Sequence, residues 1–124
     1  LRERGSQFVQ VDSTSHVDGQ AKVEGPVIVG KNCVINGDVS IKGPAVIGAG
    51  CRVDSGAVIE GLVLWDRVHV GKGARLVDCV VATGGHIHDG CLIPSGCVLG
   101  DNVKLEPGYM MSEGTKVEPD TTLG

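Results

Sequence analysis

The stretch "VIGAGCRVDSGAVIEGLVLWD", residues 46–66, contains both the regularity that decides the fold and an interruption of it. From Ile47 to Ile59 every sixth residue is aliphatic, and a further step of six would reach Trp65. The series instead resumes one residue early, at Leu64. The fold must therefore accommodate a strict six-residue period and a shortened step.

The six-residue period extends through almost the whole chain. Its apolar positions run, with two five-residue steps between the segments, over Val11–Ile59, Leu64–Leu76 and Val81–Leu123. Gly, Asp, Asn and Lys often lie between these positions, and such residues suit tight corners. A period of six fits neither an α-helix nor a hairpin series, but it is typical of parallel strands stacked in coils. We therefore predict an all-β parallel β-helix of six to seven triangular coils, with three hexads per coil.

Composition supports a narrow aliphatic core and excludes several classes of protein. The chain has 20 glycines and one residue each of Phe, Trp and Tyr, so large aromatic side chains cannot build its interior. A net charge of −4 gives no reason to expect nucleic acid or a membrane surface as a partner. Five cysteines without a C-x-x-C pair or a signal peptide predict buried, reduced thiols in a cytoplasmic protein.

A long run from residue 23 to residue 81 resembles a known family. It includes the "GPVIVG" and "GPAVIG" steps, the segment "VLWDRVHVGKGARL" and both shortened steps. These features are similar to the C-terminal domain of sugar-1-phosphate nucleotidyltransferases, especially mannose-1-phosphate guanylyltransferase-like proteins. The resemblance implies a single-stranded, left-handed β-helix domain over residues 11–124. Residues 1–10 fall outside the six-residue period and are expected to form a linker or N-terminal cap. The left hand rests on the resemblance alone, because parallel crossovers generally favour the right hand.

The resemblance also implies that this domain is not catalytic. In that family the nucleotide and the sugar phosphate bind a separate N-terminal α/β domain, which has a glycine-rich phosphate loop. No residue of this chain matches that loop, so we expect no catalytic residue and no cofactor here. The parent enzyme would use a nucleoside triphosphate and Mg. The expected partners are the N-terminal catalytic α/β domain and further copies of the chain in a homo-oligomer, and the expected role is assembly or regulation.

A candidate interface follows from the position before each inward residue, which should point outward. On the edge with the shortened steps this position is aliphatic in five successive coils, and Leu62 is expected to extend the resulting stripe. Trp65 lies beside it, either covering backbone or anchoring a partner. Alternatively, the shortened corners turn Val63 and Val80 inward. The predicted interface residues are Ile28, Val46, Leu62, Val63, Trp65, Val80 and Val98.

Histidines support two further hypotheses about function. His69 and His86 are one shortened coil apart and should stack in one outward column, with His88 nearby. These three side chains are weak candidates for metal ligands, and a solvated surface role is the simpler interpretation. The alternatives to a non-catalytic assembly domain are therefore a stand-alone hexapeptide-repeat acyltransferase or zinc enzyme, and a purely structural oligomerisation module.

Overall fold

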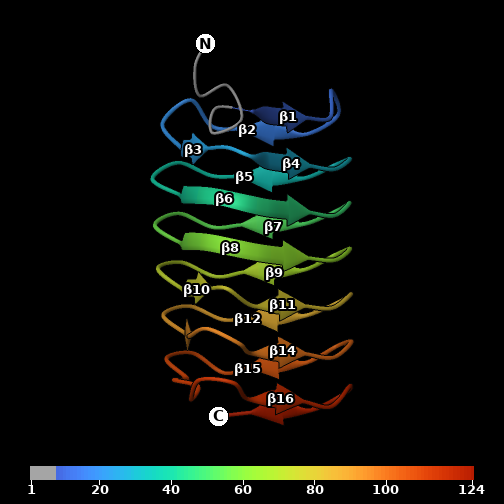
Figure 1. Ribbon diagram of the computed structural model, residues 1–124, viewed down its shortest axis with the longest axis vertical. Coiled ribbons are helices and arrows are strands. Elements are labelled where there is room, and N and C mark those ends of the chain that lie inside the picture. The colour runs from blue at the N-terminus through green and yellow to red at the C-terminus, as the bar shows by residue number, and fades with distance from the viewer. Residues whose placement is uncertain (1–7) are drawn as a thin grey trace.

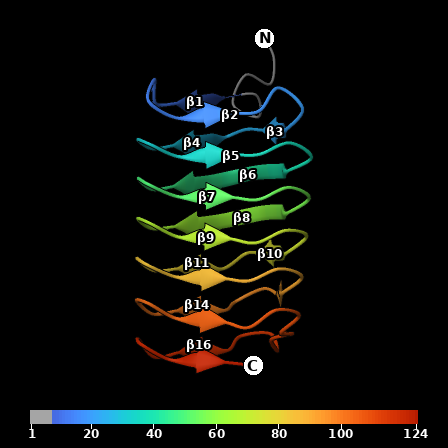
Figure 2. The ribbon, with the colours of Figure 1, turned by 180° about the vertical axis from the view of Figure 1, so that it is seen from behind.

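The computed structural model describes residues 8–124, which form a stack of coils built from short parallel strands (Figure 1). In that view the strands nearest the reader run to the right as the chain descends, and those behind run to the left, as the reverse view confirms (Figure 2). A chain that descends in this way is wound as a left-handed helix. The predicted all-β, left-handed parallel β-helix is therefore confirmed. Within the described part of the chain, no helix has the length and apolar character needed to cross a membrane.

The coils have three faces. We call the face toward the reader in Figure 1 the front face; it contains the C-terminal halves of β6 (Ser40–Ile47) and β8 (Val58–Leu64). Its other strands are β1 (Val9–Val11), β4 (Val27–Val29), β11 (Val80–Val81), β14 (Val98–Leu99) and β16 (Lys116–Val117). The rear face consists of β2 (His16–Val17), β5 (Val34–Ile35), β7 (Arg52–Val53), β9 (His69–Val70), β12 (His86–Ile87), β15 (Lys104–Leu105) and β17 (Thr122–Leu123). The third face consists of β3 (Lys22–Glu24), the N-terminal halves of β6 and β8, β10 (Arg75–Val77) and β13 (Leu92–Ile93).

The strand register confirms the sequence period. On the rear face, each inward residue pairs with the inward residue of the next coil, and all but the two terminal residues are buried. That column is Val17, Ile35, Val53, Val70, Ile87, Leu105 and Leu123. No polar or charged residue is buried among residues 8–124, so the core depends on stacked aliphatic side chains. The first strand begins at Val9, so Val9 and Gln10 belong to the first coil, and Phe8 directly precedes it; residues 1–7 of the expected linker lie outside the described residues.

The corner between the front and rear faces explains the recurring small polar residues. One position in this corner has a left-handed backbone in six successive coils, with φ from 54 to 79 in degrees. Gly, Asn and Asp tolerate this conformation best, and they occupy every coil except one, which has Arg. The residues in this column are Asn32, Gly50, Arg67, Gly84, Asn102 and Asp120.

The shortened steps lie on a single edge, between the third face and the front face. Between β6 and β8, Lys42 pairs with Glu60 and Ala45 pairs with Leu62, so one residue, Gly61, stands opposite two. β8 therefore lacks one residue between Glu60 and Leu62. As a result Leu62 takes the inward position that Ala45 has in β6. Leu62 is 1% exposed, so the expectation that it extends the outward stripe is wrong.

The five cysteines lie in the corners as buried, free thiols, as predicted. Cys33 Sγ donates to the carbonyl of Gly48 at 2.9 Å, and Cys51 Sγ donates to that of Trp65 at 3.0 Å. Burial raises the pKa of Cys51 to about 11 and that of Cys79 to about 12. These thiols therefore act as small core residues with weak hydrogen bonds to the backbone.

Candidate functional site

The front face carries an unbroken outward column of aliphatic side chains, which we call the stripe. Its residues pair in register from coil to coil: Ile28, Val46, Val63, Val80 and Val98. Ile28 is 42% exposed, Val46 45%, Val63 37% and Val98 39%, while Val80 is half-buried. The structure thus points Val63 outward, and the alternative that it turns inward is wrong. Gln10 and Lys116 continue the column at its two ends.

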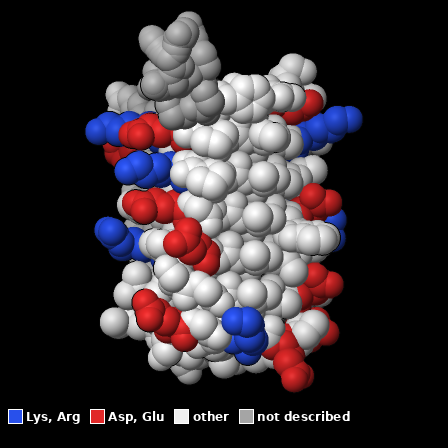
Figure 3. Space-filling view, viewed as in Figure 1, with Lys and Arg blue, Asp and Glu red and all other residues white. Residues whose placement is uncertain are grey.

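The columns on either side of the stripe are also uncharged over most of their length. Pro26 and Pro44 are exposed on the edge toward the third face. On the opposite side the column is Gly30, Gly48, Trp65, Ala82 and Gly100, in which Trp65 is 57% exposed. Figure 3 shows the result as a band with almost no Lys, Arg, Asp or Glu, flanked on both sides by charged side chains.

The backbone of Trp65 lies so close to Gly48, its neighbour in the preceding coil, that no side chain fits at that position. A Cβ added to Gly48 would lie 2.8 Å from the carbonyl carbon of Trp65 and 2.6 Å from Oδ1 of Asp66. That oxygen accepts a hydrogen bond from the Ala49 amide at 3.0 Å, which closes the adjacent corner. The exposed indole therefore lies on closely packed backbone at the level of the stripe's midpoint. A large, rigid aromatic side chain in such a position is suited to anchor an interface.

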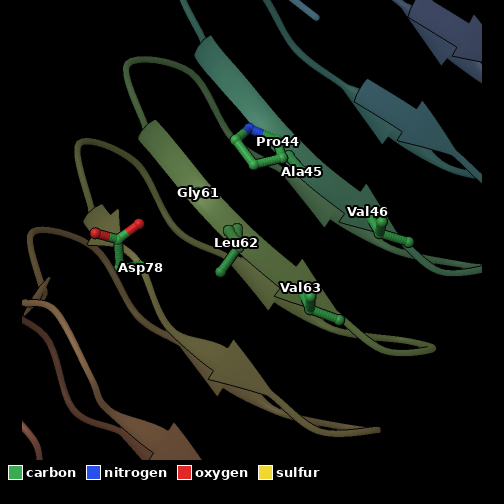
Figure 4. A pocket seen from close by; sticks show the side chains of 7 residues that line it. All are labelled: Pro44, Ala45, Val46, Gly61, Leu62, Val63 and Asp78. Atoms are coloured by element: carbon green, nitrogen blue, oxygen red, sulfur yellow. The ribbon is translucent and has the colours of Figure 1, made fainter. Parts of the chain in front are cut away.

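The first shortened corner leaves a hollow at the edge of the stripe (Figure 4). The hollow has a volume of about 250 Å³ and is open to solvent. Its floor contains Ala45 and Leu62, with Val46 and Val63 on one side and the carboxylate of Asp78 on the other. It exists because Gly61 and Asp78 occupy corners that hold Gly-Pro pairs in the two preceding coils. The structure thus combines an apolar depression with one exposed negative charge.

A polar cluster lies on the rear face. As predicted, His69 and His86 are paired in register, and their ring centroids are 4.7 Å apart with nearly parallel planes. The His88 ring stacks on His86 at 3.9 Å. Rings stacked in this way present their faces to one another while the nitrogens lie at the ring edges. Within residues 8–124, no group of three or more His, Cys, Asp or Glu side chains has the geometry to hold a metal ion.

Asp54 orients His69, a contact that the sequence did not predict. His69 Nε2 donates to Asp54 Oδ2 at 2.8 Å, and Arg52 Nε donates to Asp54 Oδ1 at 3.1 Å. Burial acts to raise the pKa of Asp54, but the hydrogen bonds from His69 and Arg52 outweigh it and lower that pKa. The available signal in the sequence was the position of Asp54, which the register places diagonally across from His69 in the neighbouring coil.

His86 has the opposite electrostatic environment. Burial, followed by the positive potentials of His88, His69 and Lys104, lowers the pKa of His86 below its ordinary value. The three histidines are therefore brought together, but they differ: His69 is held by a carboxylate, whereas His86 is held among groups that disfavour its charged form.

The comparisons with known proteins agree with this geometry. Over residues 6–111 the chain matches the family model described as the LbH domain of EIF2B subunit epsilon, where LbH denotes a left-handed β-helix. No curated protein matches the chain by sequence.

Three solved structures illustrate the shared fold. A hexapeptide transferase family protein from Anaplasma phagocytophilum has a TM-score of 0.89 at 23% identity, covering 94% of this chain and 74% of that one. A variant of perosamine N-acetyltransferase from Caulobacter crescentus, in complex with CoA and GDP-perosamine, has a TM-score of 0.85 at 18% identity. It is matched over 90% of this chain but only 53% of its own length. A putative acetyltransferase from Bacillus cereus has a TM-score of 0.62 at 21% identity, with 92% and 71% covered. Identities this low establish the fold alone.

Proposed function

The chain belongs to the family of left-handed β-helix domains that includes the LbH domain of EIF2B subunit epsilon, and we propose that it is a non-catalytic assembly domain of a nucleotidyltransferase-like protein. In this proposal the parent protein makes nucleotide sugars, and mannose 1-phosphate is its sugar substrate. The β-helix presents its front face to another folded domain or subunit. The reaction itself takes place on the separate α/β domain.

The stripe is the observation that carries this proposal. Soluble proteins rarely leave a continuous apolar column exposed without a partner, and interface cores are depleted in charge and enriched in aromatic residues. The front face has these properties, with Trp65 beside the midpoint Val63. The family match adds that the related domain is part of a larger subunit.

The test uses the complete coding region of the protein. We expect an α/β domain with a glycine-rich nucleotide loop upstream of Leu1, and nucleotidyltransferase activity that needs a nucleoside triphosphate, a sugar 1-phosphate and Mg. Val63→Asp should then lower the mass of the assembly in sedimentation. Val34→Asp is the matched control, because Val34 is an outward valine of the rear face with 39% exposure. An open reading frame that begins at Leu1, or equal effects of both variants, would contradict the proposal.

A second candidate function, acyl transfer, is favoured by one observation. The Asp54–His69 pair has the form of a carboxylate-oriented general base, which could accept a proton from an attacking amine or hydroxyl. The purified chain is incubated with acetyl-CoA and an amino or hydroxyl sugar nucleotide, and release of free CoA is measured. Turnover that is lost in His69→Gln and reduced in Asp54→Asn would favour this candidate, whereas an inactive chain would remove it.

A further inference from the structure

We propose that the partner of the front face is a second copy of this chain, packed antiparallel about a two-fold axis that passes between the two Val63 side chains. This inference rests on the proposed function, because it names the occupant of the same face. The axis lies across the stripe, so that the N-terminal coils of one copy face the C-terminal coils of the other. Isologous pairing of this kind requires a surface that is complementary to itself.

The stripe satisfies this requirement along its length. Val63 is the third of its five residues, so the two-fold axis places Val46 opposite the partner's Val80 and Ile28 opposite the partner's Val98. Every pair is apolar. At the two ends, Lys116 meets the partner's Gln10, whereas a parallel arrangement would bring each Lys116 against its own copy.

The edge of the front face that adjoins the third face has a shape complementary to the same edge of the second copy. In the two coils before the axis this edge is raised by the exposed rings of Pro26 and Pro44. In the coils at and after the axis it is lowered, because Gly61, Asp78 and Gly96 replace those rings and leave the hollow. The two-fold axis sets the raised half of each copy against the lowered half of the other. Pro44 then faces the partner's Asp78 at the side of the hollow.

Charge complementarity distinguishes the antiparallel arrangement most clearly. Lys31 and Asp101 each follow a stripe residue by three positions, so the axis places Lys31 opposite the partner's Asp101. Both side chains are exposed, and neither forms an ion pair among residues 8–124. By symmetry the pair occurs twice. On the other edge Lys42 lies opposite the partner's Val77, so no second ion pair is expected there.

Charges at the level of the axis do not favour the pairing. Glu60 meets its own copy there, which is unfavourable. On the opposite edge, exposed Asp66 and Arg67 each meet their own copy as well, so these two opposite charges are only diagonal to one another across the contact. Trp65 lies beside this level, so the two indoles approach each other near the centre of the contact. An aromatic centre with a charged rim is the usual anatomy of a specific interface.

Cysteine cross-linking tests the geometry directly, because all five native thiols are buried. Val63→Cys should form disulfide dimers under mild oxidation, since this position faces itself. Ile28→Cys alone should not, but an equal mixture of Ile28→Cys and Val98→Cys chains should. Efficient cross-linking of Ile28→Cys to itself would indicate a parallel pairing and would overturn the proposal.

Charge reversal provides a second test, measured by sedimentation equilibrium. The chain concentration should run from about 10 µM to about 1 mM, because a face only six coils tall should dimerise weakly. We expect Lys31→Glu and Asp101→Lys each to raise the dissociation constant about 10-fold, and the double variant to recover to within about 3-fold of the native value. Lys104→Glu, on the rear face, is the control and should have no effect. A native chain that stays monomeric at about 1 mM, or a double variant that fails to recover, overturns the inference. The proposed function is judged separately, by the upstream domain and by assembly of the full-length protein.

Discussion

The inward placement of Leu62 and the outward placement of Val63 can be tested by truncating each side chain to alanine. Leu62 is 1% exposed and lies in a column between Ala45 and Cys79. Both neighbours are small and cannot fill the space that Leu62→Ala would leave. Removing three buried carbons costs about 2.4 kcal/mol in transfer free energy, and the unfilled cavity adds to this. We therefore expect Leu62→Ala to lower the free energy of unfolding by about 3 to 4 kcal/mol.

Val63→Ala provides the comparison within the same strand. Its side chain loses two carbons and is 37% exposed, so only part of the transfer free energy is at stake. We expect a loss of about 1 kcal/mol. The difference between the two variants should thus be about 2 kcal/mol or more in favour of Leu62 as the core residue.

Urea unfolding followed by far-UV circular dichroism measures both values, with linear extrapolation to water. The chain should be dilute enough to remain monomeric, so that the stripe's interface role does not enter. Equal m-values would show that the solenoid still unfolds as one cooperative unit in both variants. A cost for Val63→Ala equal to or greater than that for Leu62→Ala would refute the assignment of the shortened corner.

Four further outcomes follow from the structure. Gly48→Ala should destabilise the chain by about 1–3 kcal/mol in urea unfolding, because its Cβ would lie 2.8 Å from the Trp65 carbonyl carbon. Gly19→Ala, with nothing within 4 Å of the added Cβ, should be neutral or stabilising by up to about 1 kcal/mol. The pKa of His86 is lowered in the folded chain, so as pH falls below 6.5 the unfolded chain binds a proton at His86 before the folded chain does. The native chain should therefore lose stability from that pH toward the folded-state pKa, and His86→Gln should flatten this part of the urea-midpoint profile; a profile unchanged by the substitution would contradict the shift. Because the pKa values of Cys51 and Cys79 are raised to about 11 and about 12, these thiols should react with a disulfide reagent at about pH 8 only on unfolding, and rapid labelling of the folded chain would contradict their burial.

The sequence predicted the fold because a parallel β-helix repeats one local rule. Each coil needs an inward aliphatic residue, a compact corner and a turn, and each requirement is visible within a single hexad. The stacking of His69 on His86 could be predicted from the same rule, since the period fixes which residues share a column. The inward position of Leu62 could not be predicted from this rule. Leu62 and Val63 are adjacent aliphatic residues, and the aliphatic series is the same whichever of them points inward.

The apolar period by itself determined that the chain forms stacked parallel coils with an outward stripe along the shortened edge, since alternation across a strand is a local property. Only the tertiary structure decided where the missing residue falls, and with it the inward place of Leu62 and the hollow beside Asp78. The pairing of Asp54 with His69 likewise depends on side-chain directions between neighbouring coils. Such contacts join residues of neighbouring coils. They therefore depend on the free energy of packing the whole column of side chains and not on the local sequence.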